Sequence, residues 1–326
     1  MSNKESLQEY NARLVENTSR VESVLGMVEE LSKPPEKGVV ISGMNELGFP
    51  TKIDIYGDVT IPGHGFGSYN NGDTTRGALA LYVEEVIVHN SEAKTSDIGA
   101  FRYMTGLKTF IAKEGMSSFH QYGFQACTSL KKVVFRNRKS INDYTFHGCS
   151  ALKDVDISSS RFEGIRQYAF YGCSSLETID IPPTATYINP YAFQYCTSLK
   201  IKTLPDSVAT VYAGAFDHCT SLTQISLGGV TRLYGDNSVQ GSFGGCTKLK
   251  AIWLNRASSM GMFTFVGCTA LRKIFVNTKR NLLHTYYTSY WSNGTITNCE
   301  IICVDEEGFM TKEEFDAIDW DKVITE

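Results

Sequence analysis

The fold of this chain is decided by residues 165–182, which read IRQYAFYGCSSLETIDIP. A Phe, a Cys three residues later and a Leu three residues after that recur in eight copies over residues 98–276, with Met104 replacing the first Cys. The copies are spaced by 22 to 27 residues, and such a period with apolar residues at fixed offsets is typical of a solenoid. Stacked coils would bury the repeat positions in continuous columns. The phenylalanines are Phe101, Phe124, Phe146, Phe170, Phe193, Phe216, Phe243 and Phe265.

After its Leu, each copy continues with a short strand pattern, as in Leu152 to Ile157 and Leu176 to Ile181. Side chains of a strand alternate between its two faces, so the two flanking apolar residues point inward and the middle residue points outward. The copy that begins at Leu199 departs from this pattern because Lys202 takes an inward position, which predicts a bulge or a shifted register. The predicted fold class is a β-rich solenoid of about eight coils, preceded by an N-terminal α-helical coiled coil.

Seven of the nine cysteines occupy one repeat position, which predicts a column with one thiol per coil. A buried thiol in apolar surroundings behaves as a small, inert hydrophobe, so we expect reduced core cysteines. Disulfides between coils and a zinc site are the alternatives, although no CxxC pair is present. Cys299 and Cys303 follow the repeats and are expected in the core of a C-terminal cap. The column comprises Cys127, Cys149, Cys173, Cys196, Cys219, Cys246 and Cys268.

Residues 5–32 carry an apolar heptad on a segment rich in helix formers, which Pro34-Pro35 ends. The narrow apolar seam favours self-association, with a trimer expected and a dimer also compatible. The alternative is an amphipathic helix that packs on its own domain. The predicted domains are an oligomerisation helix (1–33), a linker with an N-terminal cap (34–97), the solenoid (98–276) and a C-terminal cap (277–326). The seam residues are Leu7, Tyr10, Leu14, Asn17, Val21, Val24, Val28 and Leu31.

Several functional classes are disfavoured by the sequence. A net charge of −4 argues against nucleic acid, which needs a clustered basic face. No run of about 18 apolar residues predicts a membrane span, and the N-terminus lacks the apolar core of a secretory signal. Residues 303–314 resemble an EF-hand loop with Gly308 and Glu314, but a predicted strand replaces the entering helix; we expect a cap helix opened by Thr311, and no metal. No catalytic group has a recognisable partner, and no cofactor is expected.

The outward positions of the strands are the best candidates for binding. Asp156 and Asp180 place two carboxylates about one coil apart, where they can attract a cation or a basic ligand or simply be solvated; Ser226 follows in the same row. Trp253 and Phe275 suit a sugar ring or an apolar anchor if they are exposed. Their alternative is burial beneath the aromatic loop at 286–291. Tyr290 and Trp291 of that loop are further candidates, as an exposed tip.

The pattern Ala-Phe-x-x-Cys-x-x-Leu-x-x-Ile-x-Ile-Pro, clearest at 169–182 and 192–205, resembles the BspA-type leucine-rich repeat of bacteria, protozoa and their viruses. The resemblance covers about residues 98–276 and departs in the first copy and in the insertion at 229–243. It implies a curved right-handed solenoid that serves adhesion or protein binding without enzymatic activity. Many members of that family are exported adhesins with signal peptides and wall anchors, neither of which is recognisable here.

A short coiled coil joined to such repeats is similar to tail-tip or tail-fibre proteins of phages and of phage-tail-like bacteriocins, which are released by lysis. The expected function is therefore receptor binding by a homo-oligomer, which recognises a bacterial cell-surface glycan or protein and contacts other tail proteins through its N-terminus. The expected location is a virion or a tail-like particle, with the cytoplasm or the cell surface as alternatives. A monomeric leucine-rich repeat interaction module or surface adhesin, and a glycan-processing enzyme on a repeat scaffold, are the rival functions.

Overall fold

The computed structural model describes residues 38–57, 60–61, 79–89, 94–95, 99–113, 120–135, 141–157, 162–235, 240–254, 257–276, 299–303 and 311–319. The chain divides into two compact units, residues 1–37 and 38–326. The first unit, and with it the predicted oligomerisation helix at 1–33, lies outside the described residues, so the coiled coil stays a prediction. Helical structure in the described part is confined to residues 79–82 and to α4 (Lys312–Ala317).

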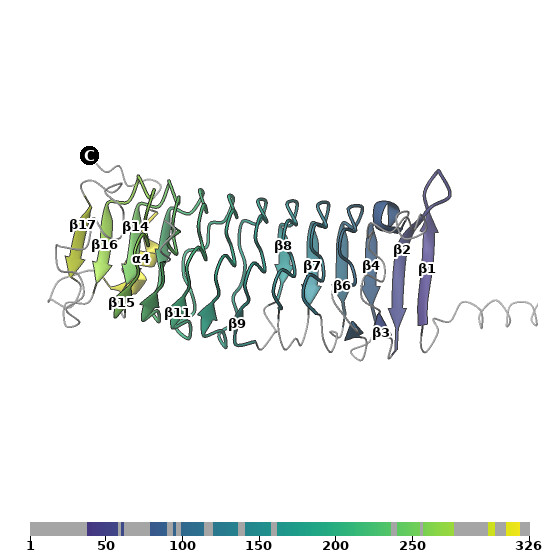
Figure 1. Ribbon diagram of the computed structural model, residues 1–326, viewed down its shortest axis with the longest axis horizontal. Helices are drawn as coiled ribbons and strands as arrows, with labels where there is room; N and C mark the ends of the chain where they lie inside the picture. Colours follow the sequence, from purple (N-terminus) through teal and green to yellow (C-terminus); the bar gives the residue numbers. More distant parts are fainter. Residues whose placement is uncertain are drawn as a thin grey trace, which may run out of the picture. The chain divides into compact units, whose positions relative to one another are not determined.

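The second unit is a β-solenoid of about seven turns, in which strands of successive coils lie side by side (Figure 1). A six-stranded sheet has the order β1-β2-β4-β6-β7-β8. Its first pair is antiparallel and every later pair is parallel, as expected where each coil repeats the course of the one before. The strands are β1 (Gly38–Met44), β2 (Pro50–Tyr56), β4 (Glu85–Val88), β6 (Thr109–Ala112), β7 (Lys132–Phe135) and β8 (Asp154–Asp156).

Three further sheets complete the solenoid. The four-stranded sheet β12-β14-β16-β17 is formed by the same repeat position as β4 to β8, but in the later coils. A five-stranded sheet, β15-β13-β11-β10-β9, is formed by the short segments that lead into each Phe. The remaining strands are β3 (Thr60–Ile61), β5 (Lys94–Thr95), β9 (Gly164–Ile165), β10 (Tyr187–Ile188), β11 (Thr210–Val211), β12 (Gln224–Ser226), β13 (Arg232–Leu233), β14 (Ala251–Leu254), β15 (Ser259–Met260), β16 (Lys273–Val276) and β17 (Glu300–Cys303).

The repeat phenylalanines form the predicted column along the core. All eight are fully buried, and neighbouring rings stack with centroids 5.2 to 6.0 Å apart and planes within 26° of parallel. The spacing of the rings is close to the separation of paired strands, so every ring fills the space between its neighbours. The predicted Phe, Cys and Leu columns are therefore confirmed as the interior of the stack.

The cysteine column is also confirmed, and its thiols are unpaired and buried. Each Sγ donates a hydrogen bond of 3.0 to 3.2 Å to the carbonyl oxygen of the repeat Phe one coil earlier, as Cys196 does to Phe170. The first copy has no earlier repeat Phe whose carbonyl oxygen a thiol could bind, so a residue without a thiol donor, Met104, can take the place of Cys there. Burial raises the pKa of the Cys127 thiol to about 12, so the reactive thiolate is suppressed. Cys299 is half-buried and unpaired, and the side chain of Cys303 lies outside the described residues.

The C-terminal elements follow the prediction from sequence. The strand expected at 300–304 is β17, which pairs in parallel with β16. The capping box at the start of α4 is present: Glu314 N–H donates to Thr311 Oγ1 at 3.2 Å, and Thr311 N–H donates to Glu314 Oε2 at 2.7 Å. Because a strand occupies the place of an entering helix, this segment does not have the architecture of an EF-hand.

Candidate binding site

The parallel register places one outward residue of each coil in a single row, which we call the outward row. In the six-stranded sheet it contains Asp54, Ile87, Ile111, Val134 and Asp156, which pair from β2 to β8. After Asp180 and Thr203 it continues through Ser226, Trp253, Phe275 and Ile302. The accessibility of this row decides where a ligand can touch the sheet.

The C-terminal end of the outward row is covered, so of the two alternatives for Trp253 and Phe275, exposure and burial, the structure shows burial. Their exposed fractions are only 3% and 2%, and Ser226 is fully buried. Phe315 of α4 packs on both aromatic rings, with its centroid 5.6 Å from Trp253 and 5.3 Å from Phe275. The cap helix therefore covers the two rings, whereas the loop at 286–291 lies outside the described residues. Trp253, Phe275 and Ser226 are unavailable to a ligand.

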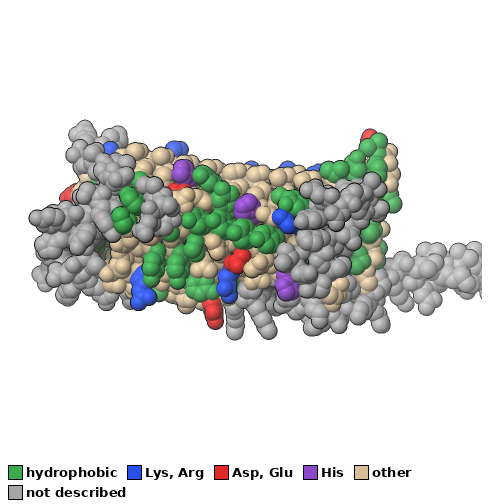
Figure 2. All heavy atoms as spheres, in the orientation of Figure 1, with side chains coloured by type: hydrophobic (Ala, Val, Ile, Leu, Met, Phe, Trp, Pro, Cys, Tyr) green, Lys and Arg blue, Asp and Glu red, His purple; other side chains and the backbone are tan. Residues whose placement is uncertain are grey.

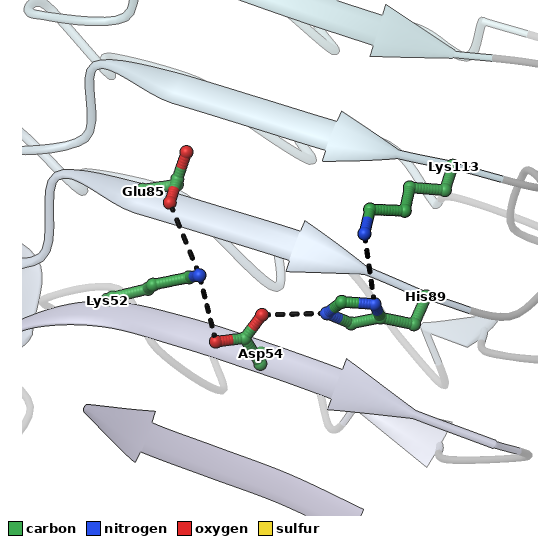
Figure 3. Close-up of polar contacts among 5 residues, drawn as sticks. All are labelled: Lys52, Asp54, Glu85, His89 and Lys113. Atoms are coloured by element: carbon green, nitrogen blue, oxygen red, sulfur yellow. Dashed lines mark hydrogen bonds and ion pairs between the residues drawn. The ribbon is translucent and has the colours of Figure 1, made fainter. Parts of the chain in front are cut away.

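The N-terminal end of the row carries a polar cluster that Figure 3 shows in close-up. Asp54 is only 6% exposed, and its carboxylate contacts Lys52 Nζ at 3.3 Å and His89 Nε2 at 2.7 Å. Lys52 also reaches Glu85 at 3.6 Å, and Lys113 Nζ lies 3.3 Å from His89 Nδ1. An ammonium group only donates, so the contact with Lys113 suits Nδ1 as the acceptor and Nε2–H as the donor to Asp54.

This cluster ties the first hairpin to the solenoid. Burial lowers the pKa of Lys52, but the nearby carboxylates of Asp54 and Glu85 outweigh burial and raise it, so the ammonium stays charged. The contacts join β2, β4 and the end of β6 across three neighbouring strands (Figure 3). His89 was not predicted as a site residue, because the histidines of the sequence share no spacing, and Asp54 lies before the first recognised repeat. Recognition of β2 as the first coil would have placed Asp54 in the outward row.

Between these two ends the sheet is interrupted, which corrects the prediction of a strand at Ile179 to Ile181. Residues 178–181 form no strand, and 199–205 contribute only the isolated bridge between Thr203 and Ser226. The cause is Lys202, whose charged side chain cannot be buried without a partner at the inward position of its copy. Lys202 is exposed, Ile201 is buried, and the regular pairing of the two coils is lost. Of the bulge and the shifted register that Lys202 predicts, the register shift is not observed, because Thr203 stays opposite Ser226 as in the regular repeat. The departure is local: Ile201 takes the buried position in place of Lys202, and the preceding coil also lacks its strand.

The interruption opens a groove on the surface, with a volume of ≈ 640 Å³. Ile179, Ile181 and Ile201 are 5 to 8% exposed and form an apolar floor. Asp180, one of the carboxylates singled out from the sequence, is exposed on one wall, and Lys202 is exposed on the other. We call this the interruption groove, and it is lined by residues 178–181 and 200–206. Asp156 is half-buried at the end of β8, on the neighbouring coil.

A column of tyrosines also lies at the surface, but the faces of its rings are not accessible to a ligand. Side chains of the hydrophobic class, tyrosine included, gather across the middle of the face in Figure 2, with histidines among them. Tyr122, Tyr144, Tyr168 and Tyr191 form a half-buried column with centroids 4.7 to 4.8 Å apart and nearly parallel planes. Because each ring covers its neighbour, only ring edges meet solvent. Sugars stack on ring faces, so this column is better suited to stabilising the coils.

The other predicted features have these outcomes. Tyr290 and Trp291 lie outside the described residues and stay candidates, as do the heptad positions at 7–31. In the part of the chain that the structure describes, no three His, Cys, Asp or Glu side chains converge as metal ligands would. Within the same residues, no helix combines the length and the apolar character needed to cross a bilayer.

Comparison with known proteins gives the following similarities. The family model for the BspA type Leucine rich repeat region matches residues 83–200 and 163–297, in six copies. A leucine-rich repeat protein of T. pallidum is 22% identical, with a TM-score of 0.36, over 74% of this chain and 91% of that one. One from Bacteroides ovatus is 17% identical, with a TM-score of 0.32, over 75% and 71%. A leucine rich cell surface protein from Faecalibacterium prausnitzii is 16% identical, with a TM-score of 0.28, over 90% and 100%. No curated protein matches this chain.

Proposed function

Because this chain belongs to the BspA-type leucine-rich repeat family, we propose that it is a recognition module which binds a protein or glycan of a bacterial cell surface, without catalysing a reaction. The binding region is the middle of the outward row, from Asp156 to Thr203. One observation carries the proposal: the interruption groove is the open part of a row whose C-terminal end is covered by α4. Asp180 lies in this groove with an exposed carboxylate, and among the described residues it has no ion-pair partner.

Replacing Asp180 with Lys is expected to weaken binding of the full chain to whole bacterial cells by about ten-fold, because an anchor charge is reversed at the centre of the site. Binding would be measured by flow cytometry on a panel of bacteria and, in parallel, on a glycan array. Glu163→Lys is the matched control, since Glu163 is exposed next to β9 in the five-stranded sheet and gives the same change in net charge. Equal loss of binding in both variants, or none in either, would place the ligand elsewhere.

We further propose that copies of the chain associate as a trimer through residues 1–33 and that the assembly is part of a phage tail or a phage-tail-like particle. The support is the apolar heptad, together with exposed apolar side chains on the strand that follows it, at Val39, Val40 and Ile41 of β1. Association would give avidity, so that each groove needs only modest affinity. A monomeric interaction module or a surface adhesin, in the cytoplasm or at the cell surface, is the rival proposal.

Light scattering of the full chain distinguishes these two proposals. A trimer is expected to give three times the mass of the 36.2 kDa chain. Replacing Leu14 and Val21 with Asp is expected to reduce that mass to one chain, because charges in an apolar seam disrupt association. The same substitutions at two exposed residues, Val40 and Ile41, show whether β1 contributes. A single-chain mass for the unmodified protein would exclude self-association through the heptad.

A further inference from the structure

Arg102, in the turn of the first repeat copy, lies over two tyrosine rings and has no acidic partner. Its guanidinium carbon is 4.5 Å from the centroid of the Tyr103 ring and 5.2 Å from that of the Tyr122 ring. Cation–π contacts use the plane of the guanidinium and leave its N–H donors to other groups. In the described part of the chain no oxygen accepts from this side chain, and its Nε is buried without a partner. The guanidinium is therefore held in position, while its hydrogen-bonding capacity is unused.

The guanidinium of Arg272 shows how this chain otherwise satisfies such a group. Its Nη1 donates to the carbonyl oxygens of Thr269 and Leu271, at 2.9 and 3.1 Å. Arg102 has no such acceptors, and a buried donor without an acceptor is uncommon enough to call for an explanation such as a ligand. A guanidinium that is already positioned by stacking also loses little freedom when it binds. Arg102 can therefore bind a ligand without first breaking an interaction of the protein.

Further donors follow Arg102 in the next two coils. Gln125 and His147 each come directly after a repeat Phe, as Arg102 does. Gln125 makes no side-chain hydrogen bond to a described residue, and only its Oε1 is buried, so its amide N–H groups remain at the surface. Burial lowers the pKa of His147, and the positive charge of Arg102 lowers it further. The charge of Arg102 is thus felt along this row of turns, which therefore suits a negative ligand.

The chemistry of these donors favours a carboxylate that a protein presents. A guanidinium with open Nη groups forms two parallel hydrogen bonds with a carboxylate or a phosphate. One guanidinium balances the single charge of a carboxylate, whereas a phosphate monoester carries about −1.5 to −2 charges at pH 7. Arg and Tyr are also enriched among the residues that anchor protein interfaces. An acidic sugar is less suited, because Arg102 and the stacked tyrosines leave no ring face for it.

We propose that Arg102, with Gln125 beside it, binds the carboxylate of an Asp or Glu side chain of a partner protein. Nη1 and Nη2 of Arg102 donate to the two carboxylate oxygens, and the amide of Gln125 donates to one of them. Tyr103 and Tyr122 are positioning residues, which hold the guanidinium by their rings. The site lies on the turns of the solenoid and not on the outward row, so this inference goes beyond the proposed function and adds a second contact surface.

Peptides from a random linear library would be selected on the full chain, after those that bind the Arg102→Gln variant have been removed. The remaining peptides are expected to share an Asp or Glu, whose replacement by Asn or Gln weakens binding by about ten-fold or more. Gln125→Ala is expected to weaken binding as well. Tyr122→Leu should do so by releasing the guanidinium, whereas Tyr122→Phe, which keeps the ring, should not. Arg166→Gln removes the same charge at an exposed position of another turn and is expected to bind like the unmodified chain.

Several results would overturn the inference. They are that no peptide remains after the removal step, that the remaining peptides lack an acidic residue, or that Gln125→Ala and Tyr122→Leu bind them as tightly as the unmodified chain. Phosphopeptides and a glycan array with uronic acids would be tested in parallel. Binding of either in place of acidic peptides, with sensitivity to Arg102→Gln, would assign the anion to another source and overturn the carboxylate of a protein. Cell binding of Asp180→Lys tests the proposed function separately, so either proposal can fail alone.

Discussion

Replacing Phe193 with Ala is expected to lower the free energy of unfolding by about 3–5 kcal/mol, the range for a large aromatic residue in a packed core. Phe193 is fully buried, and its ring stacks at 5.3 Å on both Phe170 and Phe216. Truncation would leave a cavity in the middle of the column, where two fixed neighbours limit collapse. Its carbonyl oxygen would still accept the thiol hydrogen bond of Cys219. The loss therefore reports on ring packing and not on the cysteine column.

Urea denaturation followed by circular dichroism measures this effect. Leu81→Ala is the control: it also truncates an apolar side chain, but Leu81 is 60% exposed, so a change within about 0.5 kcal/mol is expected. Since coils interact mainly with their neighbours, the Phe193 variant is also expected to unfold over a broader urea range, because the two halves of the stack become less coupled. A loss below about 1 kcal/mol would contradict a continuous packed column.

Replacing Phe315 with Ala is expected to be the second most damaging change, again by about 3–5 kcal/mol, because this side chain packs α4 on both aromatic rings of the outward row. Phe315 is fully buried although it lies on a helix of only six residues. So short a helix is not stable by itself and depends on tertiary packing. Loss of the anchor should therefore release α4 and expose Trp253 and Phe275 to water.

Trp253 fluorescence measures that exposure in a background in which Trp291 and Trp320 are replaced by Phe. The emission of Trp253 is expected to shift to longer wavelength in the Phe315 variant. Glu313→Ala, at an exposed position of the same helix, should leave it unchanged. Unchanged emission and an unchanged urea midpoint in Phe315→Ala would show that α4 does not cover the row.

The buried residues of the solenoid could be predicted one by one, because the same residue types recur at the same positions of each repeat. The Phe and Cys of the repeat, such as Phe193 and Cys196, recur with the same spacing in every coil except the first, where Met104 replaces Cys. A stack of similar coils has one inner side for them. The outer surface was predicted less well. Lys202 was recognised as misplaced, but the loss of the preceding strand at Ile179 was not, because its own sequence fits the repeat. Strand formation there depends on the neighbouring coil, which supplies the hydrogen-bonding partners.

The period and the repeated Phe, Cys and Leu determine, from sequence alone, that this chain stacks as a solenoid with three buried columns. The tertiary structure alone decides which outward positions remain accessible. Trp253 and Asp180 occupy the same outward position, yet one lies beneath Phe315 and the other lines an open groove. The physical reason is that strand alternation tells which face a side chain points to, whereas its cover comes from a distant segment whose docking no local pattern encodes.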